Sequence, residues 1–73
     1  MKITNEQYIE LSESRCWDSK EDFHKLLEEV TGIEARPYTG YSYFDSAGNF
    51  IGDSNDVCVR DLLNNAYIEI EGE

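Results

Sequence analysis

The sequence predicts one small α+β domain, with helices mainly on one face of a three-stranded and mostly antiparallel sheet. Apolar residues recur at helical spacing in residues 23–30 and 59–66, and aromatic residues gather around a glycine-containing turn in residues 38–53. Isoleucines alternate with acids in residues 67–71, as in a half-buried strand. The expected order of elements is α-α-β-β-α-β. Two strand orders remain open, because the last strand can pair with the first strand of the hairpin (2-1-3) or with the second (1-2-3).

A single domain is expected over residues 1–73. A chain of 73 residues lies near the size at which folding buries only about 60% of the unfolded surface, so its core must be small. Apolar residues make up 40% of the sequence, which contains one tryptophan, five tyrosines and three phenylalanines. This composition argues against disorder, since disordered chains are poor in aromatic residues.

The first helix begins at a capping box that runs from Thr4 to Gln7. We expect it to end within residues 14–16, with Trp17 filling the space between this helix and the next. On a helical wheel, three acids of this helix share one narrow stripe that faces outward: Glu6, Glu10 and Glu13.

The second helix has the clearest pattern in the chain. Residues 18–21 form an N-capping signal, and Gly32 stands where a left-handed residue ends a helix. Residues 34–37 then link this helix to the hairpin. The apolar residues of the helix repeat at i, i+3, i+4 and i+7: Phe23, Leu26, Leu27 and Val30.

The hairpin turn is expected in residues 45–49, as a type I turn followed by Gly48 in the left-handed conformation. If Asp45 faces Asn49, Phe44 lies opposite Phe50 on one face of the ribbon. The other face then carries Tyr41, Tyr43 and Ile51, with Tyr43 opposite Ile51. One of these two apolar faces is a candidate contact surface, unless other elements cover both or the tyrosines lie flat on the surface.

The third helix should follow the hairpin and end at residues 64–65. Its apolar residues are Val59, Leu62, Leu63 and Ala66, and three residues compete as its N-cap: Asp53, Ser54 and Asn55. In the strand expected after it, Ile68 and Ile70 share one side.

The net charge is −10, from 16 acids and 6 bases. This charge argues against direct binding of nucleic acid or of anionic membranes, both of which depend on Lys and Arg. It steers the protein instead toward basic surfaces, such as the nucleic-acid-binding clefts of other proteins. The alternative is that acidity only keeps a small protein in solution.

A cytoplasmic location is expected, because residues 1–5 lead directly into polar sequence and no apolar run approaches membrane-spanning length. In that compartment Cys16 and Cys58 should be reduced and buried. A single disulfide between them remains the alternative if the protein is exported.

No motif for catalysis, metal or cofactor is found. Cys16, His24 and Cys58 lack the spacing of a zinc site, and no glycine-rich phosphate loop is present. A calcium loop begun at Asp45 fails at its glycine position, and the polar residues there fit turn and cap roles better: Asp45, Asn49, Asp53 and Asp56. We therefore expect no catalytic residue, no metal and no cofactor, and a protein that acts by binding.

The favoured hypothesis is a non-enzymatic inhibitor or regulator that uses an acidic, tyrosine-bearing surface to occupy a basic site on a larger, nucleic-acid-handling protein. Its expected partner-binding residues are Glu6, Glu10, Glu13, Tyr38, Tyr41 and Tyr43. In size and charge the chain resembles phage-encoded host-takeover factors such as polymerase inhibitors and anti-CRISPR proteins.

Two alternatives remain. Residues 18–29, followed by three tyrosines, are loosely similar to the colicin immunity proteins, in which an acidic helix and a tyrosine-bearing segment contact a nuclease. That resemblance implies an immunity protein or antitoxin that neutralises a basic toxin. The other alternative is a scaffold subunit whose exposed tyrosines complete a homodimer, since Tyr and Trp often carry interface energy.

Overall fold

A computed structural model describes residues 1–38, 40–53 and 58–72. The described elements, in chain order, are β1 (Lys2–Ile3), α1 (Asn5–Trp17), α2 (Lys20–Thr31), β2 (Glu34–Tyr38), β3 (Gly40–Phe44), β4 (Phe50–Asp53), α3 (Val59–Asn65) and β5 (Glu69–Ile70). The predicted α+β class is confirmed. The predicted order α-α-β-β-α-β is present, with β1 and β2 as additional strands.

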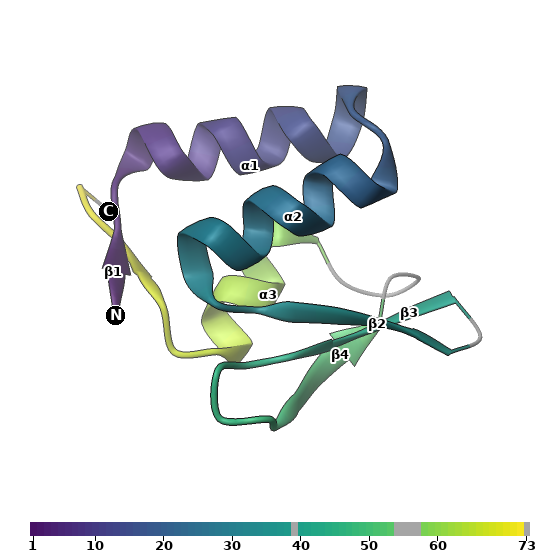
Figure 1. The fold of residues 1–73 in the computed structure, drawn as a ribbon. Helices are drawn as coiled ribbons and strands as arrows, with labels where there is room; N and C mark the ends of the chain where they lie inside the picture. The colour runs from purple at the N-terminus through teal and green to yellow at the C-terminus, as the bar shows by residue number, and fades with distance from the viewer. Residues whose placement is uncertain (39, 54–57, 73) are drawn as a thin grey trace.

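The main sheet is antiparallel, with the strand order β2-β3-β4, and the helices lie on one side of it (Figure 1). The core fills the space between these layers. Its buried members come from every helix, from the main sheet and from both ends of the described chain: Ile3, Leu11, Phe23, Leu27, Ile33, Tyr43, Ile51, Val59, Leu62, Leu63 and Ile68.

The third strand of the sheet is not the one predicted. Residues 34–37, expected as a linker, belong to β2, which pairs with β3 from Glu34↔Phe44 to Tyr38↔Gly40. Pro37 is accommodated because β2 is an edge strand, where a missing N–H does not break the sheet. Both predicted strand orders are therefore wrong.

The C-terminal strand pairs elsewhere. β5 lies parallel to β1, with Lys2 opposite Glu69 and Ile3 opposite Ile70, in a separate two-stranded sheet. The predicted alternation over residues 67–71 fails at its start, because Tyr67 adopts a left-handed conformation with φ of 57°. The strand is consequently only two residues long.

The hairpin turn is confirmed. The N–H of Asp45 donates to the Asn49 carbonyl (2.9 Å), the N–H of Gly48 donates to the Asp45 carbonyl (3.0 Å), and Gly48 has a φ of 87°. Phe44 pairs with Phe50 as predicted. The expected pair of Tyr43 with Ile51 is wrong, because a bulge moves Tyr43 opposite Gly52.

Most helix ends lie where the local sequence predicts them. The N–H of Thr4 donates to Oε1 of Gln7 (2.8 Å) and the N–H of Gln7 donates to Oγ1 of Thr4 (3.1 Å), which confirms the capping box of α1. α2 is capped by Ser19 and ends at Gly32, whose φ is 77°. α1 runs through Trp17, beyond its expected end.

The N-cap of α3 was predicted wrongly. Cys58 occupies that position and makes no capping bond with its side chain, while Asp53 ends β4. Ser54, Asn55 and the Asp56 of the rejected calcium loop lie outside the described residues.

Candidate protein-binding surface

The three acids of the predicted stripe are exposed on α1. Glu6, Glu10 and Glu13 lie at positions i, i+4 and i+7, and Trp17 follows at i+11. At 3.6 residues per turn, all four side chains leave the helix within about 60° of one another. They therefore form one row along the helix, which we call the α1 row: Glu6, Glu10, Glu13 and Trp17.

Trp17 is 85% exposed, although we expected it to fill the space between the first two helices. The physical reason is that α1 continues through Trp17, so the helical turn, rather than the connection to α2, sets the direction of its side chain. Its spacing from Glu13 is the sequence signal that could have revealed this position.

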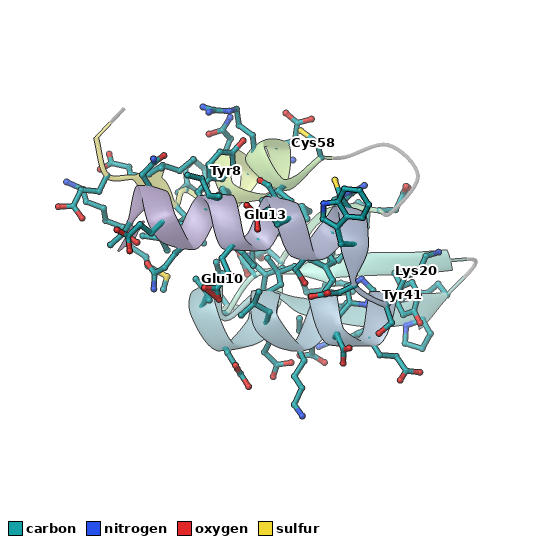
Figure 2. All side chains as sticks on the ribbon, turned by 90° about the horizontal axis from the view of Figure 1, so that it is seen from above. Tyr8, Glu10, Glu13, Lys20, Tyr41 and Cys58 are labelled. Carbon is teal, nitrogen blue, oxygen red and sulfur yellow. The ribbon has the colours of Figure 1, made fainter. Side chains whose placement is uncertain are left out.

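A hollow of about 280 Å³ lies between α1 and α2 beside this row. Leu26 of α2 contributes apolar surface to it, and the remaining lining residues come from α1 and its C-terminal end: Glu10, Glu13, Ser14, Trp17 and Asp18. Figure 2 looks down on the two helices and shows Glu10 where they run side by side. The hollow thus combines carboxylates, an indole ring and an aliphatic side chain.

Asp18 is held firmly at the edge of the hollow. Its backbone N–H donates to the Ser14 carbonyl (2.9 Å), and its Oδ2 accepts a hydrogen bond from the Ser14 hydroxyl (2.8 Å). Ser14 itself is buried. A carboxylate that is already ordered loses little side-chain entropy when a partner binds it.

The three tyrosines of the predicted site lie in different environments. Tyr38 is 67% exposed and Tyr41 is half-buried, whereas Tyr43 is only 1% exposed. The Tyr43 hydroxyl is 2.8 Å from Nε2 of His24, and the ring of Tyr41 lies 4.4 Å from the His24 ring. Tyr43 is therefore part of the core and offers no ring surface to a partner.

The α1 row and the tyrosines form two surfaces. α1 packs on α2 and α3, and α2 lies between α1 and β2, which carries Tyr38 (Figure 1). Tyr41 is next to Lys20 at the start of α2 (Figure 2), with the Lys20 ammonium 5.9 Å from its ring centre. The single acidic and tyrosine-bearing surface of the sequence hypothesis is therefore divided by α2.

The exposed face of the hairpin is the one that carries its phenylalanines. The rings of Phe44 and Phe50 meet at 5.9 Å, and the Arg36 guanidinium lies 4.4 Å above Phe44 and 3.1 Å from a Glu34 carboxylate oxygen. Phe50 is 60% exposed. Tyr38, two residues after Arg36 on the same strand, belongs to this face as well.

At the contact between α2 and the sheet, the pKa values of two side chains are shifted from their usual values. The pKa of His24 lies below its usual value, first because of burial and then because Lys20 and Arg15 repel the protonated ring. Burial also raises the pKa of the Tyr43 hydroxyl. This pair joins α2 to β3, with Tyr43 in the core and His24 half-buried.

The two cysteines are not joined by a disulfide. Cys16 and Cys58 are free and exposed, so their predicted burial is wrong. The reason is their position: Cys16 is in the exposed last turn of α1, and Cys58 precedes the first turn of α3. Over residues 1–38, 40–53 and 58–72, no three His, Cys, Asp or Glu side chains are placed to hold a metal ion.

None of the helices in the described part of the chain is long and apolar enough to cross a membrane. Comparisons with protein-family models, with curated proteins and with solved structures give no match to this chain.

Proposed function

We propose that this protein is a non-enzymatic inhibitor or regulator that binds a basic site on a larger, nucleic-acid-handling protein. The observation that carries the proposal is the α1 row, in which an almost fully exposed tryptophan continues a line of three carboxylates beside a hollow. Tryptophan is among the residues that most often dominate the energy of protein interfaces.

The charges of the protein complement this role. With a net charge of −10, the protein is attracted to positive surfaces before contact, which raises association rates and selects among partners. Successive carboxylates of the α1 row are about 6 Å apart along the helix for each i, i+4 step, against one phosphate per ~3.4 Å along a DNA strand. The row therefore offers isolated contacts to a basic cleft and does not copy a phosphate backbone.

The proposal places the protein in the cytoplasm with enzymes that handle nucleic acids. It reassigns the binding surface from tyrosines to α1, because Tyr43 is buried and Tyr38 belongs to β2, which α2 separates from α1 (Figure 1). The immunity-protein alternative predicts the same kind of basic partner and differs only in that the partner is a toxin. Identification of the partner separates the two.

The test is a pull-down from host lysate with tagged protein, washed at low and then high salt, followed by mass spectrometry. The test variant carries Glu6→Lys, Glu10→Lys and Glu13→Lys. The control carries Glu21→Lys, Glu28→Lys and Glu29→Lys on α2, which changes the net charge by the same amount at exposed positions. Circular dichroism establishes that both variants fold.

We expect one basic protein to be retained by the wild type and the α2 variant, released by salt and lost by the α1 variant. Equal retention by a folded α1 variant would overturn the assignment of the surface. Recovery of no basic partner would overturn the proposed function.

A homodimeric scaffold is the second candidate, and the outer sheet face favours it. Tyr38 and Phe50 are both exposed there, beside the Arg36–Glu34 ion pair, which a second copy can meet with the same residues in reverse. Sedimentation equilibrium tests it: a mass that rises with concentration and returns to the monomer in Phe50→Glu supports the dimer. A monomer at all concentrations excludes it.

A further inference from the structure

We infer that the hollow between α1 and α2 is a receptor for a single arginine side chain of a partner protein, with the guanidinium stacked on Trp17 and paired with the surrounding carboxylates. This inference deepens the proposed function and rests on it for the identity of the partner. It assigns to the same surface the chemical group that the surface recognises.

The charge of the lining selects a cation. Its described residues include three acids and no base: Glu10, Glu13 and Asp18 are the acids, and Ser14, Trp17 and Leu26 complete the wall. Asp18 is fixed by two hydrogen bonds to Ser14, so that one carboxylate is ready before the partner arrives. An incoming cation therefore meets a partly ordered set of acceptors.

Trp17 makes arginine a better occupant than lysine. A guanidinium is planar, stacks on aromatic faces and donates hydrogen bonds in two directions at once, whereas an ammonium is a compact and strongly hydrated charge. An arginine that lies flat on the indole can still reach a carboxylate with its edge. Its aliphatic stem then has Leu26 as an apolar neighbour.

The protein's own arginines make this kind of contact, as does Lys20 with Tyr41. Arg15 lies over Phe23 at 5.9 Å, Arg36 over Phe44 at 4.4 Å and Arg60 over Tyr8 at 5.2 Å. Within the described ranges, none of these contacts involves Trp17, which is 85% exposed beside the acids of the hollow. The indole is thus available for a cation from another molecule.

The size of the hollow fits one side chain. Its volume of about 280 Å³ falls below the ~300–1,000 Å³ of pockets that enclose drug-sized molecules. It is open along the surface, so a side chain can enter from an extended segment or a helix of the partner. Arginine-rich segments of this kind line the phosphate-binding clefts of nucleic-acid-handling proteins.

The experiment follows the indole N–H of Trp17 in ¹H–¹⁵N NMR spectra, because the chain has one tryptophan and its signal needs no assignment. The probes are acetylated and amidated tripeptides: Gly-Arg-Gly, Gly-Lys-Gly and the neutral Gly-citrulline-Gly. We expect a saturable shift of the indole signal with the arginine peptide, a smaller one with lysine and none with citrulline. Equal responses to arginine and citrulline, or no saturable shift, would overturn the inference.

Two variants locate the site. Asp18→Asn keeps an oxygen for the Ser14 hydroxyl and removes the charge, so the association constant should fall about two- to fivefold, as for an exposed ion pair. Asp61→Asn, at an exposed acid on α3, makes the same change in net charge and should leave binding unchanged. The same loss in both variants would show that overall charge, and not the hollow, attracts the peptide.

The peptide titration tests the arginine receptor and the pull-down tests the proposed function, so either can give a negative result without the other. If the pull-down gives a basic partner while the indole signal ignores the arginine peptide, the proposed function stands and the arginine receptor is excluded. If the peptide binds as expected and no basic partner is recovered, the receptor chemistry stands and the proposed function is excluded.

Discussion

The Nε2 atom of His24 lies 2.8 Å from the hydroxyl of Tyr43, and this contact joins the middle of α2 to the middle strand of the sheet. The rings of Tyr41 and Phe23 pack around the same imidazole. His24, whose sequence spacing excluded it from a zinc site, is thus a link between the two layers of the fold.

Stability should fall as the pH drops below about 6.5. The pKa of His24 is lowered by burial and by Lys20 and Arg15, so protonation favours the unfolded chain between its usual value of 6.5 and its lower folded value. The contribution of neutral His24 to the free energy of unfolding is complete above pH 6.5. It is lost as the pH falls toward the pKa of His24 in the folded protein. Urea unfolding at pH 7.5 and 5.5 measures it.

His24→Gln is the control for this pH dependence. Glutamine retains a group that can hydrogen-bond the Tyr43 hydroxyl and does not titrate, so the difference in unfolding free energy between the two pH values should shrink. An unchanged difference in this variant would show that another group is responsible.

Removal of the Thr31 hydroxyl should destabilise the fold by about 1–3 kcal/mol. Thr31 is buried, donates to the Leu27 carbonyl (2.6 Å) and accepts from the N–H of Ile33 (3.1 Å). Thr31→Val keeps the shape and leaves that N–H without its partner. Urea unfolding measures the loss.

Hydrogen exchange locates the effect. In Thr31→Val the amide of Ile33 should exchange faster, while the amide of Gly32, which donates to the Glu28 carbonyl, should keep its protection relative to global unfolding. Unchanged stability with a protected Ile33 amide would contradict this account.

Gly48→Ala should cost about 1–2 kcal/mol of stability, because an L-residue with a side chain is strained in the left-handed conformation. The φ of Gly48 is 87° and nothing lies within 4 Å of an added Cβ, so the cost is conformational and not steric. Gly48→Asn should lose less, since asparagine tolerates this region. Thermal unfolding compares the two, and equal losses would refute the explanation.

Both cysteines should react with a thiol reagent in the folded protein. Cys16 and Cys58 are exposed and free, so a colorimetric titration without denaturant should give two thiols per chain, and one in Cys16→Ser. If reaction requires denaturant, the thiols are buried, as the sequence alone suggested.

The features predicted correctly are those set by neighbouring residues. The capping box at Thr4, the end of α2 at Gly32 and the turn at Gly48 each depend on fewer than about six consecutive residues, because the interactions involved are local. The α1 row of acids was predicted for the same reason, since helical periodicity alone places its members on one face.

The errors concern contacts between distant segments. β2 was missed because a proline suggested a linker, and only its edge position makes Pro37 acceptable. The pairing of β5 with β1 joins the two ends of the described chain and has no local signal. Tyr43 is buried because its face of the hairpin packs against the helices. The sequence did not show which of the two faces would do so.

Trp17 shows a different kind of error. A large apolar residue between two helices was assumed to be buried, although single exposed hydrophobic residues are common on folded proteins. The continuation of α1 through residue 17 placed it on the acidic face instead. The environment of the residue that carries the proposed site was thus predicted wrongly.

The parallel pair of β1 and β5 also fixes an order of events during synthesis on the ribosome. Ile3 is made well before Glu69 and Ile70, and its strand has no partner until those two residues have emerged. Bringing together two strands that lie so far apart in the chain costs conformational entropy. Only the completed pair of β1 with β5 and the burial of Ile3 offset this cost. β1 is therefore left unpaired, and open to chaperones and proteases, until the segment that carries β5 has been made.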